Sequence, residues 1–299
     1  SFPTRRSSDL IKERADRGDQ EDGYNVDWMK ANLKQIVGNW GDFEPATTSP
    51  AGKGATVDFI FRNATKVSFE AQPIDVAKLL HDAKACIETK SKEPDWGVTD
   101  LDSLGYRLVV KGQTKYLKKV APARWELPLT PRLNHFDRRI TVTTPLQTPG
   151  AYLVTARVAG GNVSQIVLWV ADTAIVRKPM ADKAWVFVAD AVTGEPVAKA
   201  NVEFFGYEQK EVKDDKKRGT SHYETLTRDF TDTTDANGQV FFKTRKGELF
   251  WNWLIIATTP DGRLAYQGFS GIWIGGNRGG YDGLFSSRGR DDARAYGIT

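Results

Sequence analysis

The three histidines of this 299-residue chain are the residues whose type most often serves acid–base chemistry or metal binding. His81, His135 and His222 stand far apart in different contexts, and none belongs to the His-Glu-x-x-His pattern with which a helix holds zinc. His81 falls within a helical pattern, and His135 falls in the short stretch LNHFD. We expect structural or surface roles for these two residues and no zinc-protease site.

Cys86 is the only cysteine. A single cysteine excludes a disulfide within the chain and any metal site built from several thiolates. Cys86 lies near the apolar face of the helical pattern that also contains His81, and no base that could activate its thiol is nearby in the sequence. The sequence therefore predicts a buried, unreactive thiol.

Two stretches resemble parts of catalytic or metal-binding motifs. Ser270 lies in GFSGI, which begins like a nucleophile elbow, but Ile272 occupies the position of the last glycine. The stretch TDANGQ resembles a calcium loop around Gly238, yet Thr233 and Thr244 stand where carboxylate ligands belong. We therefore interpret the first stretch as the end of a strand and the second as a hairpin turn.

The glycine-rich C-terminal stretch resembles an RNA-binding tail with arginine and aromatic residues, but Asp282, Asp291 and Asp292 dilute its charge. We interpret this stretch as a flexible linker. The sequons that begin at Asn63 and Asn162 match a glycosylation site, and both fall in tight turns that explain their asparagines locally. Altogether, we predict no catalytic, cofactor-binding or metal-binding residue and no cofactor.

Composition narrows the classes of protein to consider. The length favours about two domains. Hydrophobic residues make up 40% of the chain, and no apolar run approaches the roughly 20 residues that a membrane-spanning helix needs. A net charge of +4 argues against a strongly basic nucleic-acid-binding surface. The nine tryptophans and 15 phenylalanines lie largely in alternating segments, where aromatic residues favour strands.

Hydrophobic periodicity predicts the elements that hold these residues. A short helix begins at Asp27 and stops at Gly38, and a second helical pattern covers residues 75–90. Strand patterns fill most of the rest, including residues 106–112, with sequence YRLVVKG. The turn signals between them are AGGN, TGEP, Asn-Gly and Pro-Asp-Gly, and the charged residues 213–218 are interpreted as a solvated loop.

Two blocks of short strands at regular spacing are typical of antiparallel β-sandwiches. We therefore predict an all-β fold of tandem immunoglobulin-like sandwiches with a short N-terminal helix and one helix inserted in the first sandwich. The expected divisions are a helical and linker segment at 11–53, sandwiches at 54–172 and 173–274, and a glycine-rich linker at 275–299. Trp185 is expected in the second core, where truncation to alanine would cost about 3–5 kcal/mol.

Residues 1–10, SFPTRRSSDL, do not fit any of these patterns. Their sequence matches the translated end of a common short-read sequencing adapter. We therefore expect these ten residues to be an artefact and exclude them from fold reasoning. We also expect that the natural protein extends beyond this chain.

Three stretches resemble a known family. Residues 172–207 followed by TDANGQVFF are similar to the macroglobulin-type β-sandwiches of bacterial α2-macroglobulin-like proteins. Residues 62–84 and 148–172 resemble the domain that precedes that sandwich in the family. The resemblance covers roughly residues 55–299. It implies N-terminal macroglobulin domains in tandem, including the MG2 kind, in a protein that traps proteases.

What the resemblance implies is a non-enzymatic scaffold segment of an endopeptidase inhibitor. The family's thioester motif runs Cys-Gly-Glu-Gln, whereas Cys86 lies in AKACIETK, so no capture chemistry is assigned to this chain. The implied partners are proteases, through the full-length protein, and further macroglobulin domains of the same chain. The implied location is the periplasm or the extracellular side of a bacterial cell envelope.

Two other functions stay open. Tandem immunoglobulin-like domains also serve as binding or adhesion modules of envelope proteins, and exposed aromatic residues would support that function. The candidates are Trp251, Trp253, Phe269 and Trp273, although strand alternation places most of them in the core. The chain could also be an accessory region of an envelope enzyme whose catalytic domain lies outside this sequence.

Overall fold

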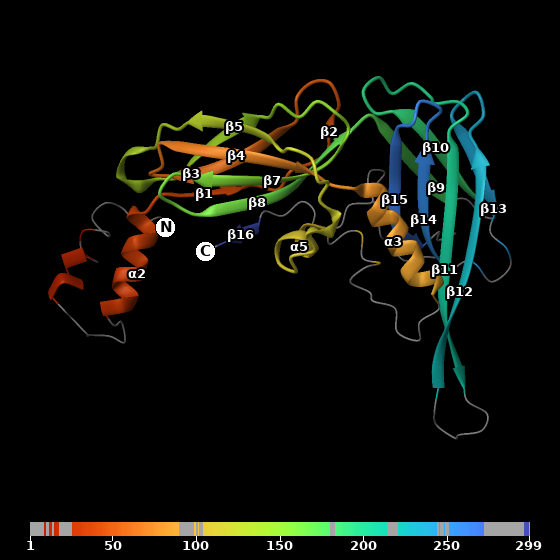
Figure 1. Ribbon diagram of the computed structural model, residues 1–299, viewed down its shortest axis with the longest axis horizontal. Helices are drawn as coiled ribbons and strands as arrows, with labels where there is room; N and C mark the ends of the chain where they lie inside the picture. The colour runs from red at the N-terminus through yellow and green to blue at the C-terminus, as the bar shows by residue number, and fades with distance from the viewer. Residues whose placement is uncertain are drawn as a thin grey trace.

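The computed structural model of the protein shows two β-sandwiches side by side along its longest axis (Figure 1). The described residues are 26–89, 104–179, 183–213, 221–243, 251–271 and 296–298, with isolated positions at 9, 12, 13, 15–17, 99, 101, 245 and 248. In this part of the chain strands dominate and helices are few, which confirms the predicted tandem immunoglobulin-like sandwich class. No described helix is both long and apolar enough to span a membrane.

The first sandwich packs a three-stranded sheet against a larger one. The smaller sheet has the order β1 (Trp40–Phe43), β3 (Thr56–Arg62), β6 (Arg138–Thr143). The larger sheet runs β8 (Val163–Ala171), β7 (Gly150–Val158), β4 (Lys66–Pro73), β5 (Ala123–Pro128). Two short strands share the free edge of β8: β2 (Ser49–Pro50) in parallel and β16 (Tyr296–Ile298) antiparallel.

Strict alternation explains why these residues form a sandwich. On β3 the side chains of Val57, Phe59 and Phe61 are buried, while the residues between them are half-exposed. Val67 and Phe69 on β4 meet them from the facing sheet in the same apolar cluster. This cluster, which we call the first core, lies wholly between the two sheets of the first sandwich.

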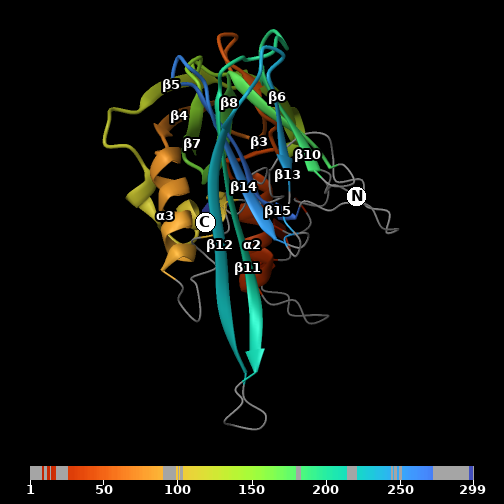
Figure 2. The ribbon, with the colours of Figure 1, turned by 90° about the vertical axis from the view of Figure 1, so that its right-hand side faces the viewer.

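The second sandwich begins one residue after β8 ends. Its smaller sheet has the order β13 (Gln239–Lys243), β10 (Lys183–Asp190), β9 (Thr173–Pro179). Its larger sheet runs β12 (Ser221–Thr233), β11 (Asn201–Lys213), β14 (Asn252–Thr258), β15 (Leu264–Gly271). The long hairpin of β11 and β12 extends well beyond the other strands (Figures 1 and 2).

A helical insert joins β4 to β5. It contains α3 (Val76–Glu88), α5 (Leu104–Val109) and the 3-10 turn η3 (Thr114–Tyr116). Asp75 caps α3, because its carboxylate accepts a hydrogen bond from the backbone N–H of Lys78 at 3.0 Å. Outside the insert lie the expected N-terminal helix, α2 (Val26–Val37), and a short 3-10 turn, η4 (Leu133–His135).

The predicted strand at 106–112 is wrong, because α5 covers most of it. Leu104 and Leu108 are buried one helical turn apart, and Tyr106 and Val110 are exposed. A short apolar run fits a strand and a helix equally well by composition, and here tertiary packing selects the helix. The insert therefore holds two α-helices in its described part, rather than the single one that was predicted.

Trp185 does not lie in the second core, so that prediction is also wrong. On β10 the buried side chains are those of Ala184, Val186 and Val188, and Trp185 lies between them on the outer face of the sheet. Its indole Nε1 donates a hydrogen bond to Gln239 Oε1 at 2.9 Å. Alternation shows which side chains share a face, but the three-dimensional packing decides which face is buried.

The predicted turn at TDANGQ is present. Asp235 Oδ1 accepts hydrogen bonds from the backbone N–H groups of Asn237 and Gln239, at 2.9 and 2.8 Å. Gly238 has a φ of +69°. A Cβ on Gly238 would also lie 2.6 Å from the carbonyl oxygen of Val188, so both the backbone conformation and the close approach require glycine.

Candidate functional site

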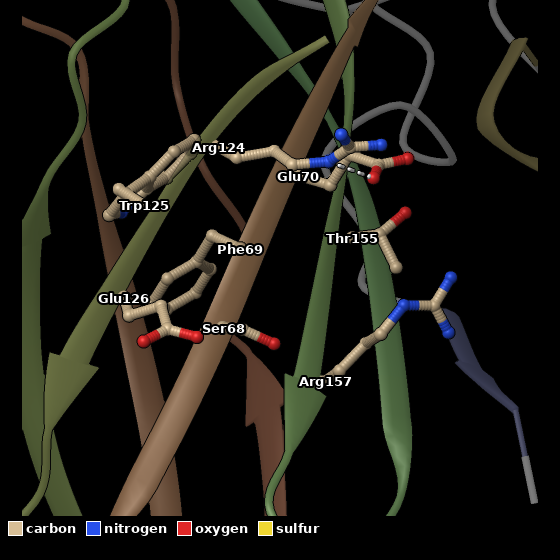
Figure 3. A pocket seen from close by; sticks show the side chains of 8 residues that line it. All are labelled: Ser68, Phe69, Glu70, Arg124, Trp125, Glu126, Thr155 and Arg157. Atoms are coloured by element: carbon tan, nitrogen blue, oxygen red, sulfur yellow. Dashed lines mark hydrogen bonds and ion pairs between the residues drawn. The ribbon is translucent and has the colours of Figure 1, made fainter.

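A shallow groove of about 410 Å³ lies on the outer face of β4, β5 and β7 (Figure 3). Beneath it, on the core side of the sheet, the Phe69 and Trp125 rings stack with centroids 5.1 Å apart and planes 14° from parallel. The residues that line it are Ser68, Phe69, Glu70, Arg124, Trp125, Glu126, Thr155 and Arg157. This groove is the candidate binding or catalytic site of the first sandwich.

Most charges in this groove neutralise one another. Arg124 Nε lies 2.8 Å from Glu70 Oε2, and the two side chains meet across neighbouring strands in Figure 3. Glu126 pairs with Lys66 at 2.6 Å. The Arg157 side chain points away from these pairs and makes no hydrogen bond or ion pair with a described residue.

The groove does not contain the groups of a catalytic site. Its hydroxyl groups belong to Ser68 and Thr155, no histidine lines it, and its two carboxylates, Glu70 and Glu126, form ion pairs with Arg124 and Lys66. Thr155 Oγ1 instead accepts a hydrogen bond from Gln165 Nε2 at 2.9 Å. The arrangement can pair charges across strands, as exposed sheet faces commonly do.

The structure places the histidines on separate elements. His81 is exposed on α3, whereas His135 lies at the end of η4, and His222 is on β12 with a side chain outside the described set. His135 Nδ1 lies 2.8 Å from Asn63 Oδ1. The Asn63 amide donates to the carbonyl oxygens of Ile36 and Gly38, so this histidine helps to fix the end of α2.

The other candidate residues have local structural partners. Asn162 exchanges two hydrogen bonds with the backbone of Gly41, at 2.9 and 2.8 Å. Ser270 Oγ donates to the carbonyl oxygen of Gly268 at 3.3 Å. Cys86 is half-buried rather than buried. Thr233 ends β12, and in the described part of the chain no three His, Cys, Asp or Glu residues form a group that could hold a metal.

The aromatic candidates for a binding platform lie mostly inside the fold. Trp253 is fully buried and Trp251 is 8% exposed, and both belong to the core of the second sandwich. Phe269 is half-buried, with its ring centre 5.2 Å from that of Tyr207 and 6.1 Å from that of Phe205. The remaining candidates, Ile272, Trp273, Thr244 and the charged loop at 214–218, lie outside the described residues, as do Asp282, Asp291 and Asp292.

A third apolar cluster, which we call the shared core, joins the two sandwiches. The helical insert supplies Leu79, Leu80, Ala83, Ile87, Leu104, Leu108 and Tyr116. The outer face of the first sandwich supplies Ala151, Leu153 and Val167, and that of the second supplies Phe205, Tyr207, Leu254 and Ile256. Figure 1 shows α3 beside the second sandwich and α5 beside the first. This packing joins the two sandwiches through one continuous apolar cluster.

A charged group reinforces the shared core. Lys84 on α3 forms ion pairs with Glu203 on β11 and, at 3.1 Å, with Asp229 on β12. Its ammonium also lies 5.3 Å from the centre of the Phe205 ring. Burial by itself lowers the pKa of Lys84, but the hydrogen bonds with Glu203 and Asp229 outweigh burial, so the net pKa is raised.

A second contact braces the junction between the sandwiches. Arg263, near the turn before β15, donates to Asp190 Oδ2 at 2.8 Å and to the carbonyl oxygen of Asp172 at 3.1 Å. The backbone N–H groups of Thr193 and Val192, helped by Arg263, lower the pKa of Asp190 to about 2. Asp172 is the single residue between β8 and β9, so Arg263 ties the second sandwich to the connecting residue.

Sequence reasoning missed the shared core and both charged contacts. The sequence signal was present for α3, whose apolar face was recognised, but nothing local shows that this face packs on residues more than 100 positions away. The partners of Lys84 are 119 and 145 residues distant. Such contacts depend on how the two sandwiches are placed, which the strand pattern does not encode.

No protein-family model and no curated protein matches the chain. Among solved structures, it is similar to native alpha-2-macroglobulin from Escherichia coli spanning domains NIE-MG1. The TM-score is 0.46 at 16% identity, covering 78% of this chain and 97% of that one. For the E. coli alpha-2-macroglobulin fragment spanning domains MG0-NIE-MG1, the TM-score is 0.43 at 14% identity. The match covers 76% of this chain and 64% of that one.

The chain spans only part of the longer structures that it resembles. For E. coli alpha-2-macroglobulin activated by porcine elastase, the TM-score is 0.29 at 11% identity, and the match covers 80% of this chain and 22% of that protein. At these identities and TM-scores the similarity assigns no activity to this chain.

Proposed function

We propose that the chain is a non-enzymatic scaffold segment of a bacterial α2-macroglobulin-like endopeptidase inhibitor. The segment contributes to the frame, whereas the bait and capture parts of the trap belong elsewhere in the full-length protein. The observation that carries this proposal is the shared core, in which the helical insert packs on both sandwiches at once.

A frame must keep its shape while other parts of the molecule rearrange. Domains joined by a flexible linker move relative to each other by default, unless the interface between them is large and hydrophobic. Here one residue separates β8 from β9, the shared core fills the space between the outer faces, and Arg263 and Lys84 add charged contacts. These features support a rigid two-domain unit.

The described chemistry fits a scaffold better than an enzyme. The groove on the first sandwich holds paired charges, and the histidines of the described part lie on separate elements. The binding-module alternative relied on exposed aromatic residues at Trp251, Trp253 and Phe269. Of these, Trp251 and Trp253 are buried, and Phe269 is half-buried against Phe205 and Tyr207.

We further propose the division into sandwiches at 54–172 and 173–274, preceded by the segment 11–53 and followed by the linker 275–299. The proposed partners are proteases, through the full-length inhibitor, and further macroglobulin domains of the same protein. The proposed location is the periplasm or the extracellular side of the cell envelope.

The test is to amplify outward from the codons of Ile11 and Thr299 in the source DNA and to express the complete protein. We expect further sandwiches and a bait segment, and we expect the complete protein to block an endopeptidase from a large protein substrate but not from a small peptide. The isolated chain serves as control and should not inhibit. An adjoining catalytic domain, or a complete protein without this effect, would contradict the proposal.

A further inference from the structure

The outer face of the smaller sheet of the second sandwich carries aromatic and basic side chains in adjacent rows. We call it the aromatic–lysine face. It consists of Val176 and Lys178 on β9, Lys183, Trp185 and Phe187 on β10, and Gln239, Phe241 and Lys243 on β13. The register places Lys183 opposite Lys243 and places Trp185 between Phe241 and Lys178. Directly opposite residues on neighbouring strands point to the same side of a sheet.

The aromatic side chains of this face are not part of any core cluster. Phe241 is 45% exposed, and Trp185 and Phe187 are half-buried. The Trp185 and Phe187 rings stack with centroids 5.6 Å apart and planes 2° from parallel. These three clustered and only partly covered aromatic side chains form an apolar surface patch, a feature that often marks an interaction site.

The charged side chains at the described ladder positions of this face are all positive. Its ladder positions include three lysines and no carboxylate. Lys183 Nζ lies 4.7 Å from the centre of the Phe241 ring, and none of the three lysines pairs with a described carboxylate. Unpaired lysines around apolar rings complement a partner that is both acidic and apolar.

Among the described strands, the backbone of β13 has unpaired hydrogen-bonding groups, which suit a polypeptide partner. Val188 N donates a hydrogen bond to Gly238 O at 2.9 Å, so these two opposite residues form a hydrogen-bonded pair of the antiparallel ladder. Along such a strand the backbone N–H and C=O groups point alternately toward the partner strand and away from it. By this alternation, the N–H and C=O groups of Phe241 and Lys243 point away from β10. In the described part of the sheet, no strand pairs with β13 on that side. An extended segment can therefore be added there as a further strand.

We propose that the aromatic–lysine face binds an extended polypeptide segment in which acidic and apolar side chains alternate. The segment pairs with the free edge at Phe241 and Lys243 and directs its acidic side chains toward the lysines of the face. A single-stranded nucleic acid is less compatible, because stacking of bases needs free ring faces. Here Trp185 and Phe187 stack on each other, and Lys183 covers a face of Phe241.

The test measures binding of a fluorescent peptide with alternating glutamate and valine residues to the full chain by fluorescence anisotropy. The triple variant Lys178→Gln, Lys183→Gln and Lys243→Gln should weaken binding by about tenfold or more, because it removes every charge of the face. The matched control replaces Lys53, Lys118 and Lys119, exposed lysines of the first sandwich, by glutamine and should leave the affinity unchanged.

Two further probes decide the kind of partner. A peptide with lysine in place of glutamate should not bind, and single-stranded oligothymidine should bind more weakly than the acidic peptide. Failure of the acidic peptide to bind, equal loss in both triple variants, or stronger binding of oligothymidine would overturn the inference. The inference does not depend on the scaffold proposal, because a rigid joint between the sandwiches and an inhibitor function do not require this face.

Discussion

The second sandwich has two outer faces that differ in what covers them. The outer face of the β11–β14 sheet carries Phe205, Tyr207, Leu254 and Ile256 under the helical insert, in the shared core. The outer face of the β9–β10–β13 sheet carries Trp185, Phe187 and Phe241 without a covering element in the described part of the chain. Aromatic content is therefore a poor guide to burial. The covering element decides whether a face becomes core or surface.

The largest difference in unfolding free energy should appear between two tryptophans of the second sandwich, Trp253 in its core and Trp185 on its outer face. Trp253 is fully buried and covers Gly206, so Trp253→Ala should cost about 3–5 kcal/mol of unfolding free energy through lost burial and a cavity. Trp185→Ala should cost only about 1 kcal/mol, because its ring is half-buried on the surface. Chemical denaturation of both variants checks this, and equal losses would remove the distinction.

Leu254 tests the covered face. Its side chain is fully buried in the shared core, so Leu254→Ala should cost about 2–4 kcal/mol and loosen the joint between the sandwiches. The matched control is Leu264→Ala on the neighbouring strand β15, where the side chain is 39% exposed and the cost should stay near 0.5 kcal/mol. Thermal unfolding and hydrogen exchange of α3 are the measurements. If hydrogen exchange in α3 stayed unchanged in Leu254→Ala, this would argue that α3 does not pack on Leu254.

Lys84 tests the charged part of the same joint. Lys84→Met leaves Glu203 and Asp229 without their cation and should cost about 1 kcal/mol. Lys78 on the same helix is more exposed and, among the described residues, pairs with Asp82 alone, so Lys78→Met should cost less than about 0.5 kcal/mol. Denaturant titrations compare the two variants. A larger loss for Lys78→Met would contradict the role given to Lys84.

A further prediction concerns the pH dependence of the Asp190–Arg263 contact. The pKa of Asp190 is about 2 in the folded protein and near 3.8 when unperturbed, so the unfolded state takes up the proton first as the pH falls. The stabilising contribution is present above pH 4 and is lost as the pH falls toward 2. The stability advantage of the wild type over Asp190→Asn should shrink across this window, and a constant difference would contradict the assignment.

The local signals in the sequence sufficed for the fold class and for most turns. Alternation identified the strands, and the Asp235–Gly238 turn follows from residue types that prefer such backbone conformations. The same logic failed at residues 106–112, where a short apolar run is compatible with either helix or strand. At Trp185 it gave the strand correctly but the wrong buried face.

The sequence patterns did not predict the contacts between elements that are distant in the chain. Whether the apolar face of α3 packs on one sandwich or on both depends on where β11 and β14 lie in space. The pairing of Lys84 with Asp229 and the bracing of Asp172 by Arg263 follow from that placement. The aromatic–lysine face likewise emerged only when β9, β10 and β13 were set in register.

The most direct test of the account is a distance measurement across the joint. Spin labels are attached at Thr56→Cys in the first sandwich and Thr231→Cys in the second, both exposed positions, in a Cys86→Ser background. If the shared core makes the two sandwiches one rigid unit, pulsed electron resonance should give a single narrow distance distribution. A broad distribution would show that the sandwiches move independently, and the scaffold proposal would lose its main support.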